Sequence, residues 1–157
     1  MVKNTTEIVF RDETHCQCVT GNIYTLYTLG EASSDNIHKL VTHFDRFATS
    51  ARGDIACIII TGAATSPPDG DDRRKVANVM AKHRARLKGL AIVLQAEGFR
   101  GAIIRSVAAG IFILPNPGYP TKFFAKPGDS SAWVAERIDS TSTQVRAAID
   151  DTIKIIS

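Results

Sequence analysis

The chain lacks the short motifs by which nucleotide-binding, hydrolytic and metal-dependent proteins are most readily recognised. None of its 11 glycines belongs to a GxGxxG or GxxxxGK[ST] phosphate-binding loop, and no GxSxG places a nucleophilic serine after a strand. The four histidines are scattered, and no group of His, Cys, Asp or Glu has the spacing of a metal site. We therefore expect no cofactor and no metal, and a binding or regulatory module rather than an enzyme. A catalytic triad assembled from distant residues stays open as an alternative.

Charge excess, long apolar runs and cysteine are also scarce. The 19 basic and 16 acidic residues leave a net charge of +3, which is too small to predict nucleic-acid binding without a clustered basic stripe. The longest apolar segment, residues 102–114, contains Arg105 and is too short to cross a bilayer, and residues 1–7 do not resemble a signal peptide. The three cysteines form no CxxC pair, so we expect reduced, partly buried thiols. Together these absences favour a soluble, cytoplasmic protein with a protein partner.

Two short apolar runs are the strongest positive signal in the sequence. Residues 55–60 and residues 90–94 are continuously hydrophobic, and a helical pattern follows each of them. Such runs are typical of strands that are buried on both faces, as in a parallel sheet covered by helices. A chain of 157 residues is most simply one domain. The sequence therefore predicts a single α/β domain with parallel central strands.

The remaining elements complete this pattern. Residues 7–10 and the threonine-rich run 15–29 predict an N-terminal β-hairpin, in which Gly21-Asn22 forms a bulge or splits the second run into two strands. Ser33, Ser34 or Asp35 is suited to cap the first helix. Beyond these, the spacing predicts helices over 71–88 and 100–114, a strand over 121–125, and a helix capped by residue 129, 130 or 131.

The C-terminal segment carries a second kind of signal. Val145, Ile149, Ile153 and Ile156 recur at helical spacing after a run of serines and threonines that disfavours helix. We therefore expect an α/β domain over residues 1–138 and a C-terminal helical extension over residues 139–157. The apolar stripe of this extension would allow the chain to form a homo-oligomer.

The order of these elements resembles the STAS fold, the domain of sulfate transporters and anti-sigma-factor antagonists. The resemblance covers residues 7–138 and rests on topology, with residues 55–61 as the strand that precedes the functional loop. It implies a mixed sheet and a non-catalytic role in signalling or scaffolding. Antagonists of this family carry a phosphorylatable serine or threonine in that loop, usually after an aspartate. Here the loop offers Thr65 and Ser66 without that aspartate, and two prolines follow them.

The loops after the two central strands are the candidate site. Thr65 and Ser66 would lie where ligands of open α/β sheets often bind, as a phosphorylation or anion site, or they form a turn stiffened by proline. Asp69 and its acidic neighbours suit a hard cation, or simply the start of a helix. Glu97 and Arg100, in the next loop, suit an anion or a partner carboxylate, or a solvated turn.

Two functions are consistent with these features. The first is a STAS-like protein-interaction module that presents loops and helix faces to a partner. The alternative is a small-molecule or lipid-binding protein, or an enzyme without a recognisable motif, whose pocket surrounds these loops. The basic helix after Arg73 is best explained as a solvated face, since it lacks the aromatic residues that stack on bases.

Overall fold

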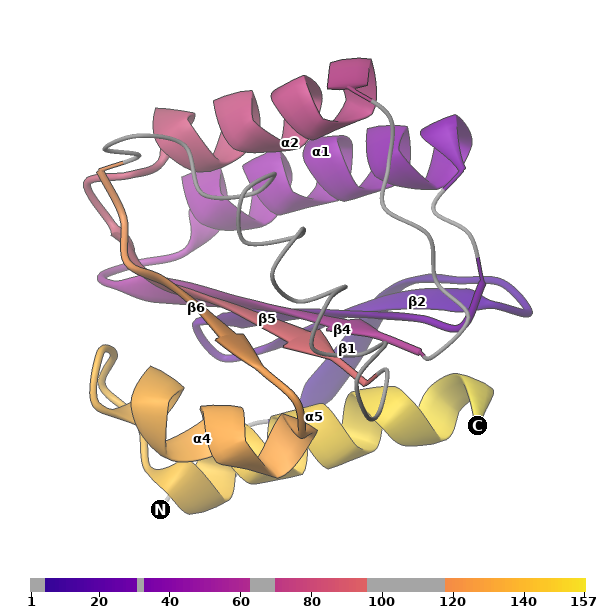
Figure 1. Cartoon of the computed structure of the whole chain (residues 1–157). Coiled ribbons are helices and arrows are strands. Elements are labelled where there is room, and N and C mark those ends of the chain that lie inside the picture. The colour runs from indigo at the N-terminus through magenta and orange to yellow at the C-terminus, as the bar shows by residue number, and fades with distance from the viewer. Residues whose placement is uncertain (1–4, 31–32, 63–69, 96–117) are drawn as a thin grey trace.

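A twisted sheet of six strands forms the centre of the molecule, and helices cover both of its faces (Figure 1). The computed structural model describes residues 5–30, 33–62, 70–95 and 118–157. The sheet order is the order of the chain: β1 Thr6–Arg11, β2 His15–Thr20, β3 Ile23–Thr28, β4 Ile55–Thr61, β5 Leu87–Leu94 and β6 Thr121–Phe124. The predicted mixed sheet is confirmed.

The direction of the strands changes at β3. The first three strands pair antiparallel, because their connections are too short for any other arrangement. Gly21 makes the second of these turns with a φ of 59°, so the run 15–29 is split into two strands. From β3 to β6 every pair is parallel, and the helix α1 supplies the crossover between β3 and β4.

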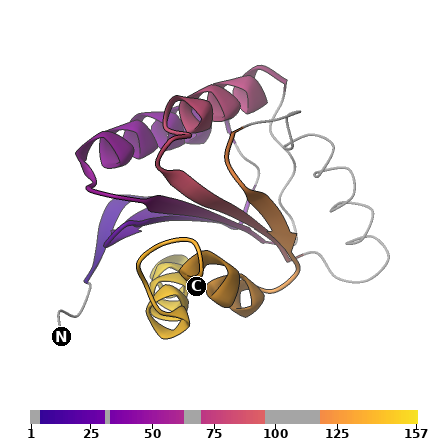
Figure 2. The same cartoon turned by 90° about the vertical axis from the view of Figure 1, so that its left-hand side faces the viewer.

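The helices form two layers, one on each face of the sheet (Figure 2). The first layer contains α1 Ser34–Ser50 and α2 Gly70–Lys82, and the second contains α4 Pro127–Ala135 and α5 Ser142–Ile156. The chain is therefore a single α/β domain, as predicted. The helix expected over residues 100–114 lies outside the described residues.

The two central strands confirm the main expectation from sequence. Ile58 and Val93 are both 0% exposed, and β4 and β5 run parallel to each other. In β5, Leu90 and Ile92 belong to the core under α1 and α2, whereas Val93 belongs to the core under α4 and α5. Because both faces are covered, the central positions of these strands are apolar without alternation, and this explains the continuous runs 55–60 and 90–94.

The helix boundaries agree with the sequence at some ends and differ at others. Ser33 caps α1 as expected, and its hydroxyl accepts a hydrogen bond from the Asn36 amide at 3.1 Å. The second helix ends at Lys82 instead of residue 88, because the chain turns there and Leu87 begins β5. Similarly, α4 starts at Pro127, whose fixed φ suits the first helical position, and not after a cap at 129–131.

The C-terminal helix packs on the sheet. A capping box between Thr141 and Gln144 starts α5. The apolar stripe of this helix faces β2 and β3. Val145 and Ile149 are fully buried in the core under this helix. The expected homo-oligomer surface is therefore wrong for these two residues, since the chain's own sheet covers them. Ile153 and Ile156 are partly buried against the same core.

Candidate functional site

The residues that the sequence suggests as a site fall outside the described part of the chain. Thr65, Ser66 and Asp69 lie in segment 63–69, and Glu97 and Arg100 lie in segment 96–117. Their mutual geometry stays a prediction. The carboxyl ends of β4 and β5, which lead into these loops, are described, and they lie side by side in the sheet.

One acidic residue near the first of these loops is described. Asp72, in the first turn of α2, is only 4% exposed, and it accepts a hydrogen bond of 2.7 Å from the Ser34 hydroxyl at the start of α1. The Lys75 ammonium lies 3.8 Å from the same carboxylate. This carboxylate therefore ties the starts of the two helices together. Within the described ranges, no three His, Cys, Asp or Glu side chains are grouped closely enough to hold a metal ion.

A groove between β1 and α1 is a hollow lined entirely by described residues. Its volume is about 520 Å³, within the range of roughly 300–1,000 Å³ that is usual for ligand sites. The sequence did not predict it. The lining residues come from β1, from the end of β2 and the turn after it, and from the second half of α1 and its C-cap: Glu7, Ile8, Val9, Val19, Gly21, Asn22, His43, Arg46, Phe47, Ser50 and Ala51.

The strand wall of the groove is an edge of the sheet. In the described sheet β1 is hydrogen-bonded to β2 alone, so the backbone groups on its outer side have no strand partner. The register of the pair shifts between Ile8 and Phe10, which leaves Val9 as the extra residue of a bulge. Ile8 is 49% exposed, and among the described residues no other large hydrophobic side chain is classed as exposed.

The helix wall is a polar stripe along α1. Lys39, His43, Arg46 and Ser50 recur at intervals of four, three and four residues, so they share one face of the helix. The Lys39 ammonium lies 4.3 Å from the ring centroid of Phe10 on β1, which shows that this face is turned toward the strand. Three members of the stripe, His43, Arg46 and Ser50, line the groove with cationic and hydrogen-bonding side chains.

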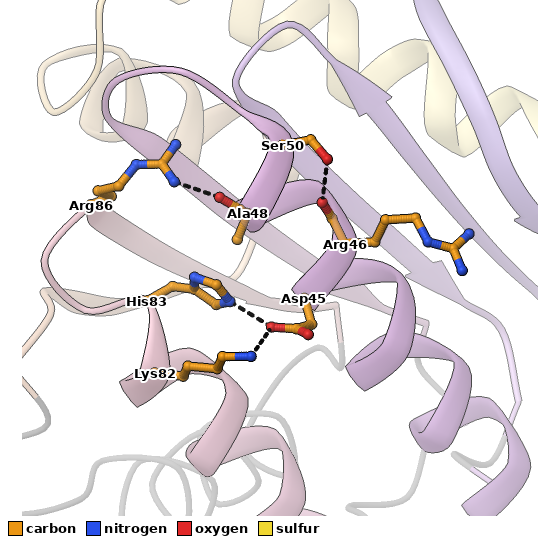
Figure 3. A network of polar contacts seen from close by, with 7 residues as sticks. All are labelled: Asp45, Arg46, Ala48, Ser50, Lys82, His83 and Arg86. Atoms are coloured by element: carbon orange, nitrogen blue, oxygen red, sulfur yellow. Dashed lines mark hydrogen bonds and ion pairs between the residues drawn. The ribbon is translucent and has the colours of Figure 1, made fainter.

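Two members of this stripe have polar side-chain groups without a partner among the described residues. The Nδ1 atom of His43 is buried without a hydrogen-bond partner in the described structure. Burial lowers the pKa of His43, and the positive charges of Arg46 and Lys39 lower it further. The Arg46 side chain extends away from the neighbouring polar network (Figure 3), and no ion pair joins it to any described residue. By contrast, the Ser50 hydroxyl donates to the Arg46 carbonyl at 2.8 Å.

The opposite side of α1 is fixed to α2. Asp45 accepts hydrogen bonds from the Lys82 ammonium at 2.9 Å and from the His83 ring at 2.7 Å (Figure 3). These two bonds, that of Lys82 first, lower the pKa of Asp45. The helix that forms the groove wall is therefore held from behind.

The carboxyl end of α1 is held by a single arginine. The guanidinium of Arg86 donates to the carbonyls of Ala48 and Ala51, and its Nε donates to the Gly53 carbonyl at 3.0 Å. The last carbonyls of a helix have no partner within the helix, so these bonds satisfy groups that would otherwise need water. The side-chain amide of Asn22, which lines the groove, donates hydrogen bonds to the carbonyls of Arg52 and Asp54 in the segment after α1.

A buried polar row lies on the same face of the sheet. The Tyr24 hydroxyl donates to the Gln17 side-chain oxygen, and the Gln17 amide lies 2.8 Å from Nε2 of His15. The tyrosine occupies the oxygen of Gln17, so the amide must donate and His15 Nε2 must accept. Burial lowers the pKa of His15 to about 4, which keeps the ring neutral.

The cysteines behave as the sequence predicts. All three are free and buried. The Cys16 thiol donates to the Thr152 carbonyl at 3.4 Å under α5. Burial raises the pKa of the Cys57 thiol, so the group stays protonated and unreactive.

Comparison with known proteins adds a likeness of fold. No family model matches the sequence, and no curated protein matches it. The chain is similar to a crystal structure of an uncharacterized protein of the DUF3478 family from Shewanella loihica PV-4, which is described as having a SpoIIAA-like fold. The identity is 14%, the match covers 82% of this chain and 91% of that one, and the TM-score is 0.48. The likeness concerns the fold alone.

No helix among the described residues combines the length and the apolar character needed to span a bilayer.

Proposed function

We propose that this chain is a non-catalytic, STAS-like interaction module that regulates or scaffolds a cytoplasmic complex by binding a partner protein at the β1–α1 groove. One observation carries the proposal: an unpaired strand edge and a polar helix face border the same hollow. Proteins that recognise other proteins often combine such an edge with a neighbouring helix. The groove wall is also held rigidly from behind, so little order has to be gained on binding.

The composition of the groove suits binding. Val19 and Phe47 give it apolar surface, and its helix wall offers His43 and Arg46. The exposed side chain of Ile8 lies on the other face of the same edge strand. Apolar area supplies most of the driving force for association, and a few polar groups fix the orientation of the partner.

Photo-crosslinking in the cell of origin tests this proposal. A photoreactive amino acid in place of Ile8 lies on the free edge strand that borders the groove, whereas the same residue in place of Glu136 lies on the other helix layer, where the side chain is 74% exposed. We expect the probe at Ile8 to capture one protein of defined mass and the probe at Glu136 not to capture it. Equal capture at both positions, or no capture at Ile8, would contradict the proposal.

The loops at the carboxyl ends of β4 and β5 are proposed as a second contact surface. Thr65, Ser66, Asp69, Glu97 and Arg100 supply hydroxyls, carboxylates and a cation there. Phosphorylation at Thr65 or Ser66 would add negative charge near the start of α2 and alter that surface. Mass spectrometry of the protein isolated from its own cells tests this: a phosphate on either residue supports the switch, and an unmodified segment in all growth conditions contradicts it.

A second candidate function is the binding of a small molecule or lipid. The observation in its favour is the volume of the groove, about 520 Å³, which suits a ligand of moderate size. Native mass spectrometry separates the two candidates. A bound small molecule that is lost when Phe47 is replaced by aspartate would favour this second function over the first.

A further inference from the structure

We infer that the groove binds a short, extended segment of the partner and that it selects a segment with an acidic side chain beside a bulky apolar one. This inference rests on the proposed function and specifies its partner. It follows from three properties of the groove, namely the backbone of β1, the exposed apolar surface and the placement of charge.

The backbone of β1 favours an extended segment. Its outer edge carries amide and carbonyl groups without a strand partner, and an added strand would satisfy them at a spacing of about 4.8 Å. The bulge at Val9 interrupts the regular edge, so only a few residues can pair on either side of it. The same irregularity disfavours long edge-to-edge pairing between copies of the chain.

The exposed apolar side chain of β1 predicts a bulky side chain in the segment. Ile8 is about half exposed, and it pairs with Cys18, so its side chain lies on the face of the sheet opposite to α1. Successive side chains of an extended segment point to alternate faces, so a residue that covers Ile8 would be the neighbour of one that faces α1. Aliphatic and aromatic side chains fit this role, because the gain depends on the apolar area removed from water.

The charges predict an acidic side chain on the helix side. Arg46 is exposed and has no ion pair within the described residues. Lys39, further along the stripe, is already paired with Asp35 at 2.9 Å. A carboxylate beside Arg46 would form the ion pair that this guanidinium lacks. Glu7 on the strand wall would repel the same carboxylate, which fixes the side of the groove on which it lies.

A library of random ten-residue peptides displayed on phage, selected on the purified full chain, tests the inference. We expect the enriched peptides to carry Asp or Glu within two residues of a bulky apolar residue. Binding of the tightest peptide to Arg46→Glu should weaken at least tenfold, and Arg46→Gln should give an intermediate loss. The matched control is Arg74→Glu, an exposed arginine of α2 paired at 3.6 Å with Asp71, which should stay within twofold of the parent chain. Thermal unfolding verifies that all three variants are folded.

Two further measurements locate the bound peptide. Replacing its acidic residue by lysine should restore binding to Arg46→Glu by at least tenfold, as expected for a direct charge contact. In NMR spectra of the labelled chain, the amide shifts caused by the peptide should concentrate in residues 7–9 and 43–51. Both results together would support the inference.

Several outcomes would overturn it. These are an absence of enriched peptides, enrichment without an acidic residue, equal losses in the Arg46 and Arg74 variants, or amide shifts outside the groove. Light scattering that shows a dimer dissociated by Arg46→Glu would assign the groove to a second copy instead. If crosslinking at Ile8 persists in Arg46→Glu while no acidic peptide is enriched, the proposed function stands and only this inference fails. If an acidic peptide binds in the groove but no protein is crosslinked, the peptide preference stands and the proposed function fails.

Discussion

The two helix layers are attached to the sheet by different kinds of interaction. Under α4 and α5 the contacts are mainly apolar, and Val134, Val145 and Ile149 are fully buried against the sheet. The polar bonds to the sheet there come from the Cys16 thiol and the Thr6 hydroxyl to α5. Under α1 and α2 there is also an apolar core, but polar bonds join its parts: Asp45 links the two helices, and the buried row from Tyr24 to His15 lies on the sheet beneath. The groove belongs to this second layer.

The two kinds of interaction differ in how closely they fix the position of a helix on the sheet. Apolar packing is strong but non-directional, whereas hydrogen bonds fix distances and angles between their partners. A groove that recognises a partner must keep its walls at a constant separation. The polar bonds behind α1 supply this constraint, whereas the opposite layer is held chiefly by packing. Four predictions test this contrast, from the largest expected effect to the smallest.

The largest effect is expected for Ile149→Ala in α5. The side chain is fully buried, so its truncation removes apolar burial and leaves a cavity. We expect a loss of about 4 kcal/mol in the free energy of unfolding, measured by urea denaturation. Ile153→Ala, at a partly buried position of the same helix, is the matched control and should cost clearly less. Equal losses would show that α5 is not held by its buried stripe.

Acidification should weaken the α1 side of the molecule. The pKa of His15 is about 4 in the folded chain and 6.5 in the absence of burial, so the unfolded chain binds a proton more readily. The stability contributed by neutral His15 is therefore fully present above pH 6.5 and is lost as the pH falls toward 4. The difference between these two pKa values corresponds to a loss of about 3 kcal/mol once the ring is protonated in both states.

Urea unfolding at pH 7.5 and pH 4.5 measures this loss. His15→Gln removes the titrating ring and keeps an amide that can bond to Gln17, so its stability should change much less between the two pH values. The lowered pKa of His43 leaves a smaller residual dependence of the same sign. An unchanged pH dependence in His15→Gln would show that the buried row does not control acid sensitivity.

The contrast between the layers also explains which features were predictable from sequence. The central strands were predictable because burial on both faces demands an apolar residue at every position, as in residues 55–60. The end of α2 was not, because Leu87 lies four residues after His83 and fits a helical stripe as well as a strand. Only the three-dimensional turn after Lys82, which brings Arg86 to the end of α1, distinguishes the two.

The groove was harder to predict for a related reason. The spacing of His43, Arg46 and Ser50 shows that they share a helix face, but not what that face meets. That β1 is an edge strand depends on the pairing of the whole sheet, which no local pattern reveals. The candidate residues in the loops, Thr65 and Arg100 among them, stay a prediction because they lie outside the described residues.

Replacing Arg86 should loosen the groove wall with a moderate loss of stability. Arg86→Met keeps much of the apolar length of the side chain but removes the donors to Ala48, Ala51 and Gly53. We expect a loss of about 2 kcal/mol in the free energy of unfolding, as is typical when a charged hydrogen-bond donor is removed. Arg74→Met, at an exposed position, should change stability by less than about 0.5 kcal/mol. In hydrogen exchange, the amides of the last turn of α1 should lose protection in Arg86→Met alone.

The smallest effect tests how tightly the other layer is packed. Gly89 in β5 lies beneath α4, where an added Cβ would stand 3.1 Å from Trp133 Cζ3 and 3.2 Å from Arg137 Cδ. The Arg137 guanidinium stacks over the Trp133 ring at 3.9 Å, so neither side chain can move without disturbing the other. We expect Gly89→Ala to cost about 1 kcal/mol in thermal or urea unfolding, the low end for overpacking, because both contacts involve side chains that can shift slightly. Gly70→Ala is the control, since its added Cβ would meet only the end of Arg73 at 3.7 Å. A stability equal to that of the control would mean that α4 yields easily, and packing alone would then not account for the rigidity of this layer.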